Sequence, residues 1–151
     1  MLRHTTQLNR VGITLGGLPG VHAMTDVTGF GLAGPLLEVC RGSGLDAHVT
    51  LADLPLIDEA AAFAREGIVT GASARNWAAY GESVTWPASA PAWMQALASD
   101  PQTSGGLLVS CAPEAVQAVL ATFAQAGFDQ AAAVGELTAR RPGASPQLVF
   151  A

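Results

Sequence analysis

Lysine is missing from this sequence. All seven basic residues are arginine, twelve residues are acidic, and the net charge is −5. The absence excludes mechanisms that need a lysine within the chain, such as a Walker-type phosphate lysine or a Schiff base. Nucleic acids and anionic membranes bind basic surfaces, so the acidic balance argues against both as partners. A phosphate ligand would therefore be held by backbone N–H groups, by a few arginines or through a carboxylate-bound Mg²⁺.

Three further features are scarce or absent. The two cysteines, Cys40 and Cys111, make neither a disulfide framework nor a CxxC metal site. The longest apolar runs are interrupted by glycine, proline or a charge, and they fall short of a membrane span. Residues 1–20 lack the unbroken apolar core of a secretory signal. We therefore expect a cytoplasmic protein without a membrane segment.

Half of the 151 residues are apolar, which is enough to bury one sizeable core, so we predict a single domain over residues 1–151. Segments with strand and helix patterns alternate, but without the regular rhythm of βαβ units. The pattern predicts an α+β fold, with helices packed on a mixed, largely antiparallel sheet. The predicted strands are 21–27, 46–51, 107–111, 132–138 and 147–150, and the predicted helices include 58–66, 75–80 and 92–98.

A carboxylate followed by glycines marks the end of the first predicted strand. Residues 23–31, which we call the first motif, are Ala-Met-Thr-Asp-Val-Thr-Gly-Phe-Gly and lead into an apolar helical pattern. Mg²⁺ is bound by one or two carboxylates together with phosphate oxygens and water, and glycines let the backbone approach a ligand. Asp26 is thus a candidate metal ligand. On spacing alone, an ordinary strand-to-helix turn in which Asp26 only caps the backbone explains the pattern better.

A polar loop that contains glycine precedes another predicted strand. Residues 99–108, the second motif, are Ser-Asp-Pro-Gln-Thr-Ser-Gly-Gly-Leu-Leu. A loop of this kind can surround an anion with backbone amides. Asp-Pro and Gly-Gly are also common in ordinary turns, and the segment by itself favours that interpretation.

Considered as a pair, the two motifs resemble the signature stretches in the C-terminal domain of selenophosphate synthetases (selenide, water dikinases). Between and beyond the motifs, residues 54–56, 67–69, 75–76 and 127–136 also follow the family's order. The resemblance spans roughly residues 8–138. Related ATP enzymes, such as aminoimidazole ribonucleotide synthetase and thiamine-monophosphate kinase, carry different sequences at both motifs.

The resemblance implies an activity and a site. Family members make selenophosphate from selenide and ATP, with AMP and phosphate as the other products. Their ATP lies between an N-terminal domain and this one, with Mg²⁺ ions held by aspartates, and Asp26 matches the one aspartate that the C-terminal domain contributes. The other aspartates, and a Cys or selenocysteine with its partner Lys, belong to the N-terminal region, so we expect no catalytic residue in this chain. The residues expected to bind ATP are Thr25, Thr28, Gly29, Gly31, Asp100, Gln102, Thr103, Ser104, Gly105 and Gly106.

The remaining reactive side chains are expected to be structural. Cys40 falls on the apolar face of a predicted helix and Cys111 at the end of a predicted strand, where small buried thiols are common. The three histidines share no metal-ligand spacing. We expect the three tryptophans to pack beneath a long loop rather than to stack on a base.

One position departs from the family. After Gly-Phe-Gly-Leu-Ala-Gly the family usually carries His, and this sequence has Pro35. Proline is tolerated in the first turn of a helix, so we predict that the helix begins at Pro35 with Gly34 as its N-cap. The helix start and its partial positive charge would then shift by about one turn from Asp26.

Two functions remain open. In the first, the chain is the C-terminal part of a selenophosphate synthetase and needs an N-terminal ATP-binding domain to be active. In the second, it is a stand-alone domain that binds a ligand or a partner chain without catalysis. A sibling ATP-dependent enzyme of the same superfamily is a further alternative, which both motifs disfavour. Family members pair mainly through the N-terminal domain, so the sequence leaves open whether this chain forms a homodimer.

Overall fold

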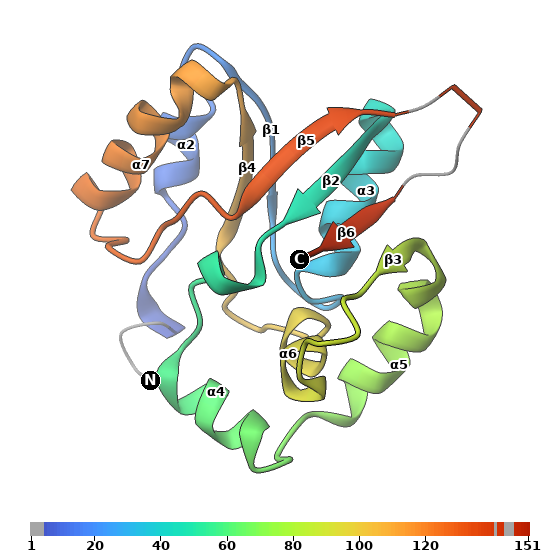
Figure 1. Ribbon diagram of the computed structural model, residues 1–151. Helices are drawn as coiled ribbons and strands as arrows, with labels where there is room; N and C mark the ends of the chain where they lie inside the picture. The colour runs from blue at the N-terminus through green and yellow to red at the C-terminus, as the bar shows by residue number, and fades with distance from the viewer. Residues whose placement is uncertain (1–4, 141, 144–146) are drawn as a thin grey trace.

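In the computed structural model, residues 5–140, 142–143 and 147–151 are described, and helices and strands are interspersed along the chain (Figure 1). The helices are α2 (Val11–Leu15), α3 (Ala33–Ser43), α4 (Asp58–Arg65), α5 (Gly71–Tyr80), α6 (Ala92–Ala98) and α7 (Val116–Gln125). The strands are β1 (Val21–Asp26), β2 (Leu45–Val49), β3 (Val84–Thr85), β4 (Leu107–Cys111), β5 (Gly135–Ala139) and β6 (Leu148–Phe150). Short 3₁₀ turns occupy Leu51–Asp53, Gly81–Ser83 and Pro113–Ala115.

The strands form two sheets rather than the single sheet expected from the sequence. β1 and β4 make a two-stranded antiparallel sheet, and the other four strands follow the order β3-β6-β2-β5. In the larger sheet, β2 is antiparallel to β5 and parallel to β6, and β6 is parallel to β3. Each antiparallel pair aligns five residue pairs, against three and two for the parallel pairs. These observations confirm the predicted α+β class with a mixed sheet.

Apolar side chains gather in two clusters. The smaller core lies between α2 and α7, which are side by side next to β4 in Figure 1. Its buried members are Val11, Leu15, Val119 and Phe123. The buried members of the larger core are Ala33, Leu36, Leu37, Cys40, Ala47, Val49, Leu51, Tyr80, Ala98, Leu148 and Phe150.

Strand β4 lies between the two cores. Successive side chains of a strand point to opposite faces. Leu107, Val109 and Cys111 accordingly pack against the smaller core, and Leu108 packs against the larger one. Cover on both faces explains why this strand carries apolar side chains on both faces. The second motif leads directly into β4, so it lies where the two cores meet.

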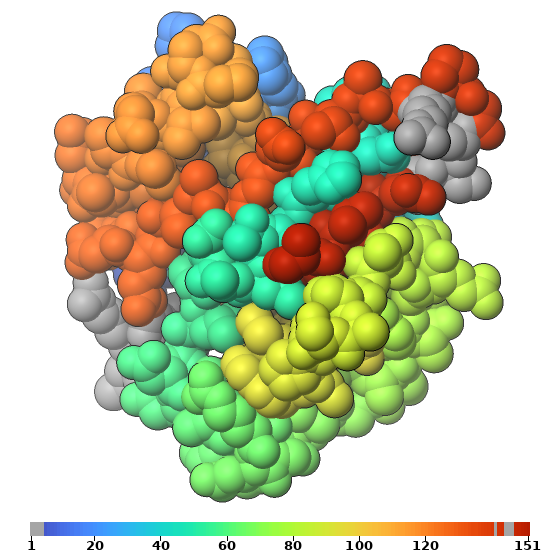
Figure 2. Space-filling model, viewed as in Figure 1, coloured from blue at the N-terminus to red at the C-terminus, as the bar shows by residue number. Residues whose placement is uncertain are grey.

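Helix α3 covers one face of the four-stranded sheet (Figure 1). Its buried Leu36, Leu37 and Cys40 recur at helical spacing and share a core with Ala47 of β2 and Phe150 of β6. The opposite face of the sheet is part of the molecular surface, where β5, β2 and β6 lie side by side (Figure 2). In the described part of the chain, no helix has both the length and the apolar character that crossing a membrane requires.

Helix α3 begins earlier than predicted. It starts at Ala33 with Leu32 as N-cap, so the prediction of a start at Pro35 with Gly34 as N-cap is wrong. Pro35 is the third helical residue, where an N–H would have no partner inside the helix. Gly34 permits a tight turn, because a Cβ there would collide with Cβ of Phe30. The helix therefore starts two residues closer to the first motif than expected.

The cysteines and two of the tryptophans are packed as predicted. Cys40 is fully buried in α3, and Cys111 is half-buried at the end of β4; both are free thiols. The ring centroids of Trp77 and Trp86 lie 5.5 Å apart in an edge-to-face arrangement, and Trp86 lies 4.9 Å from Phe150. These rings pack on the larger core rather than standing free to stack on a base.

Candidate functional site

The two motifs meet at one end of the two-stranded sheet. Because β1 and β4 are antiparallel, the end of β1 lies beside the start of β4. The Val27 N–H donates to the Gly106 carbonyl over 2.9 Å, and the Gln102 N–H donates to the Thr28 carbonyl over 3.0 Å. The motifs, far apart in the sequence, therefore form one continuous surface.

Two of the predicted glycines are required by the contact between the motifs. Gly31 has a φ of 65°, and a Cβ there would lie 2.6 Å from the carbonyl carbon of Ser99. A Cβ at Gly105 would collide with the carbonyl oxygen of Val27. Each motif thus contributes one glycine against which the backbone of the other motif packs. The sequence predicted a close backbone approach by a ligand, but at these two positions the approaching group is the other motif.

Two other glycines that are predicted to bind ATP have free space above their Cα atoms. A Cβ built at Gly29 or Gly106 would meet no heavy atom within 4 Å, and both residues are exposed. Neither has a positive φ, so the backbone conformation does not require glycine at either position. The packing of the chain does not explain these two glycines. An exposed backbone without Cβ cover is suited to close approach by a ligand.

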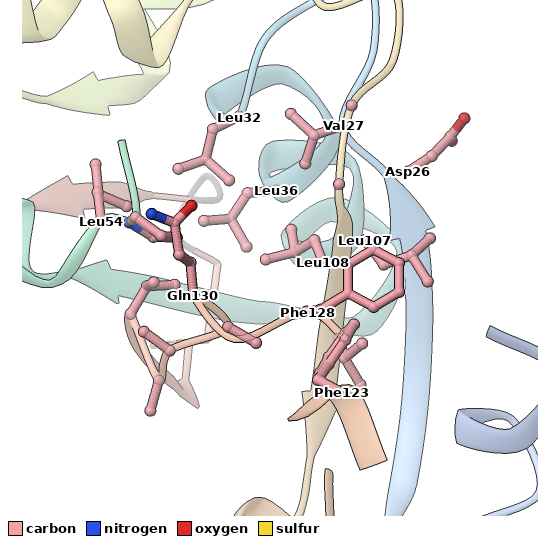
Figure 3. Close-up of a pocket in the computed structure, with 18 of the residues that line it drawn as sticks. Asp26, Val27, Leu32, Leu36, Leu54, Leu107, Leu108, Phe123, Phe128 and Gln130 are labelled. Atoms are coloured by element: carbon pink, nitrogen blue, oxygen red, sulfur yellow. The ribbon is translucent and has the colours of Figure 1, made fainter. Parts of the chain in front are cut away.

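Asp26 ends β1 with its side chain exposed. In Figure 3 it lies at the rim of a cavity and points away from the apolar side chains inside. Within the described residues its carboxylate makes no hydrogen bond or ion pair, so it is not the backbone cap that spacing alone favoured. No group of three or more His, Cys, Asp or Glu side chains in these residues could hold a metal ion. A cation at Asp26 would need its other ligands from outside the described part of the chain.

An open cavity of about 1080 Å³ extends from the motifs into the space between the two cores (Figure 3). Its walls include Leu32 and Leu36 beside the larger core, and Phe123 and Phe128 beside the smaller one. Seven predicted site residues line it: Asp26, Thr28, Gln102, Thr103, Ser104, Gly105 and Gly106. The other four lie outside its lining: Thr25, Gly29, Gly31 and Asp100.

Asp100 has partners within the protein. Its Oδ1 accepts hydrogen bonds from the hydroxyl groups of Thr70, over 2.7 Å, and Ser73, over 3.0 Å. Thr70 is the N-cap of α5, and Ser73 lies in the first turn of that helix. Asp100 therefore attaches the second motif to the start of α5, a contact that the sequence did not predict.

For two residues that hold the motifs, the sequence predicted no role in the site. Asn76 Nδ2 donates to the carbonyl oxygens of Gly29 and Ser99, each over 2.9 Å. The Tyr80 hydroxyl donates to the carbonyl of Phe30 over 2.9 Å. Burial raises the pKa of Tyr80 to about 12, so this hydroxyl remains a donor at neutral pH. The available signal was the spacing of polar residues on one face of a helix rich in alanine and aromatic residues.

The chain belongs to the family described as AIR synthase related protein, C-terminal domain, which matches residues 3–145. It is also similar to selenide, water dikinases. That of Burkholderia pseudomallei (strain K96243) is 58% identical over 137 residues, which cover 91% of this chain and 39% of the relative. That of Dechloromonas aromatica (strain RCB) is 55% identical over 143 residues, covering 95% and 41%. The chain thus spans about two fifths of the length of these relatives.

Solved structures share the fold. A crystal structure of hydrogenase maturation protein HypE matches 95% of this chain and 38% of its own chain, with a TM-score of 0.60 at 20% identity. A structure of HypE in complex with ATP has the same TM-score at 19% identity. At these identities the likeness shows the fold alone. The family match and the selenide, water dikinase relatives together confirm the resemblance inferred from the two motifs.

Proposed function

We propose that this chain supplies one wall of a Mg²⁺-ATP site in a selenophosphate synthetase, and that an N-terminal domain supplies the other wall. The observation that carries the proposal is the meeting of the two motifs, which puts an exposed carboxylate and two open glycines on one surface. The match to selenide, water dikinases covers more than nine tenths of this chain. The chain spans 39% of the first of these relatives, which leaves room for a second domain in such an enzyme.

Asp26 is the proposed Mg²⁺ ligand. Mg²⁺ usually takes one or two protein carboxylates and completes its coordination with phosphate oxygens and water. An exposed carboxylate without a partner in the described residues fits one such ligand. The remaining ligands would come from ATP, from water and from the N-terminal domain. When bound, Mg²⁺ would neutralise charge on the phosphates.

The open backbone of Gly29 and Gly106 is the proposed surface for ATP. Since the chain has no lysine, it would contact phosphate through backbone N–H groups, hydroxyl groups, arginines or bound Mg²⁺. Thr103 and Ser104 line the cavity together with Gly106 and bring hydroxyl groups beside it. Most of the catalysis in phosphoryl transfer comes from aligning the phosphoryl groups and neutralising their charge. The proposed contribution of this chain is therefore to hold ATP and Mg²⁺ in position.

A chimeric enzyme tests the metal role. The N-terminal part of the Burkholderia pseudomallei relative is joined to this chain, and selenide-dependent ATP consumption is measured. We expect Asp26→Asn to lower turnover more than about 100-fold with an unchanged melting temperature, because a charge-neutralising ligand is lost. The control is Asp53→Asn, at an exposed aspartate outside both motifs, which should leave turnover within about twofold of the parent. Parental turnover in the Asp26→Asn chimera would disprove the metal role.

Substitutions at Gly105 and Gly106 test contact with the ligand separately from the stability of the fold. We expect Gly106→Ala to raise the KM for ATP about tenfold without loss of stability, because its Cβ would occupy open space that ATP approaches. Gly105→Ala should instead destabilise the protein, because its Cβ would meet the Val27 carbonyl. An unchanged KM in the Gly106→Ala chimera would exclude this glycine from the ATP contact.

Binding without catalysis is the second candidate function, and the lack of lysine in a chain that spans two fifths of its relatives favours it for the isolated chain. Calorimetric titration with Mg-ATP distinguishes the two functions. A shared site predicts binding only after the N-terminal part is added. Binding by the chain alone, together with an inactive chimera, would favour the stand-alone function.

A further inference from the structure

Helix α5 presents a polar face to both motifs. Among the described residues, the buried polar side chains are Ser73, Asn76 and Ser99. Two of these belong to α5, and the third opens the second motif. Ser73, Asn76 and Tyr80 lie on one face of the helix, at intervals of three and four residues. Buried polar groups destabilise a fold unless they are paired, and no buried side-chain polar atom in the described residues lacks a partner.

Asn76 joins the two motifs directly. It is 8% exposed, and its Nδ2 lies 2.9 Å from the carbonyl oxygens of both Gly29 and Ser99. Both partners are acceptors, so the side-chain atom that contacts them must be the amide nitrogen, and both of its hydrogens are used. A single planar group therefore spans the gap between the turn of the first motif and the start of the second.

The two ends of α5 add one anchor to each motif. At its N-terminal end, Thr70 and Ser73 donate to Asp100 of the second motif. At its C-terminal end, Tyr80 donates to Phe30 of the first motif. Among the hydrogen bonds of the described residues, only the side chain of the central residue, Asn76, reaches both motifs.

We propose that Asn76 is a positioning residue that sets the separation of the two motifs. It thereby places Gly29 and Asp26 relative to the loop 102–106. That the positioned site is for Mg-ATP rests on the proposed function. The coupling of the motifs through α5 rests on the hydrogen bonds alone and is tested separately.

Asn76→Asp keeps the shape of the side chain but, when ionised, donates no hydrogen and faces two carbonyl oxygens. Amide hydrogen exchange of the 151-residue chain is followed at Gly31 and Gln102, whose N–H groups donate to Thr28. We expect exchange at these amides to accelerate about tenfold more than at Ala47, whose N–H lies in the larger core. An equal acceleration at all three amides would overturn the proposal, because Asn76 would then stabilise the whole fold.

Gln117→Glu is the matched control. Gln117 is an exposed amide on α7, and its replacement by Glu adds a negative charge and keeps the side-chain shape, as Asn76→Asp does. We expect all of these exchange rates to stay within about twofold of the parent protein. Tyr80→Phe, which removes only the hydroxyl bonded to Phe30, should accelerate exchange at Gly31 more than at Gln102. The reverse order would contradict separate anchoring of the motifs.

The pH dependence of amide exchange distinguishes the loss of hydrogen-bond donors at position 76 from the loss of packing there. Burial between two carbonyl dipoles should raise the pKa of the carboxyl group introduced by Asn76→Asp, and its protonated form regains one donor. The excess exchange at Gly31 and Gln102, expressed as protection factors, should therefore shrink as pH falls below that pKa. Asn76→Ala has no such group and should show no recovery. Equal profiles for the two variants would overturn a role based on donation.

The chimera tests the consequence for the ligand. We expect Asn76→Asp to raise the KM for ATP about tenfold and to change kcat less, because the separation of the binding loops is altered. An unchanged KM with faster local exchange would overturn the link between Asn76 and ATP. If the parent chimera neither binds nor consumes ATP, the proposed function fails, and the exchange data still decide whether Asn76 couples the motifs.

Discussion

The larger and the smaller core contribute differently to this fold. The larger core contains α3, β2 and β6, together with the packed rings of Trp77, Trp86 and Phe150. The smaller core has four buried side chains between two helices and the β1–β4 pair. Among the residues that the structure describes, Leu15 is the one member of the smaller core that belongs to the largest fully buried apolar side chains.

The difference assigns separate roles to the two cores. Burial of apolar area is the main favourable contribution to folding, so the larger core should carry most of the stability. The smaller core covers the other face of β4, the strand that holds the second motif in place. Damage to the larger core should unfold the protein, whereas damage to the smaller core should loosen the motifs first.

Phe150→Ala should have the largest effect. Phe150 is 2% exposed, and we expect a loss of about 3–5 kcal/mol in the free energy of unfolding, measured by urea denaturation. The control is Phe63→Ala, because Phe63 is 53% exposed and its removal should change stability by less than about 1 kcal/mol. Similar losses in the two variants would contradict the importance of the larger core.

Leu37→Ala and Leu15→Ala compare the two cores with the same chemical change. Both leucines are 0% exposed, one in each core. We expect about 4 kcal/mol for Leu37→Ala and about 3 kcal/mol for Leu15→Ala, because the sparser core can collapse more easily around the smaller side chain. Leu15→Ala should also accelerate amide exchange at Val27 more than at Ala47. The opposite order of stabilities would show that the smaller core carries more of the fold than its size indicates.

The start of β2, an inner strand of the larger sheet, should be sensitive to pH. Asp46 Oδ1 accepts from the Gln147 N–H over 3.0 Å and from Arg140 Nε over 3.2 Å. The backbone hydrogen bond from Gln147, and then Arg140, hold the pKa of Asp46 below its usual value, against an opposing effect of desolvation. Because the folded pKa is lowered, the stabilisation is complete above the unfolded pKa of about 3.9 and is lost as pH falls through the folded pKa.

The measurement compares the free energy of unfolding of the parent protein and Asp46→Asn between about pH 2 and pH 7. The parent should be more stable near neutral pH, and the difference should shrink toward zero at the acidic end. A difference that stays constant with pH would show that the charge of Asp46 does not contribute.

The reactivity of the two cysteines should show the smallest difference between the two cores. Burial raises the pKa of both thiols, with a further contribution from Asp46 at Cys40 and from Glu114 at Cys111. A thiol-reactive disulfide reagent should modify the half-buried Cys111 first and the fully buried Cys40 only as the larger core opens. Both rates should continue to rise above the ordinary thiol pKa of about 8.5. Cys111→Ser should remove the fast phase, and a fast phase that persists would contradict the assignment.

Elements with strong local patterns were predicted well. The bounds of α6 and β4 agree with the prediction, because a run of apolar residues between polar or glycine-containing segments marks them locally. Helix α5 was predicted only over 75–80, and it begins four residues earlier, at Gly71. Its first turn is held by Asp100, thirty positions from its N-cap Thr70, and no local pattern contains that contact.

The sequence predicted the two segments that form the candidate site. It did not predict which residues within them support the fold and which are open to a ligand. Gly105 and Gly106 are adjacent and alike in the sequence, yet one packs against Val27 and the other is open. Asn76 was noted as part of the family resemblance without a role, because a residue that bridges two distant loops has no signature in its own neighbourhood.

The sequence by itself determined the family, the lack of lysine chemistry and the order of most helices and strands, because side-chain inventory and hydrophobic periodicity are local properties of the chain. The tertiary structure decided which glycines support the fold and which remain open to a ligand. It also decided that α5 holds the motifs together. Both depend on contacts between distant residues, such as the hydrogen bond from Asn76 to Gly29, 47 positions away, and such contacts exist only once the chain has folded.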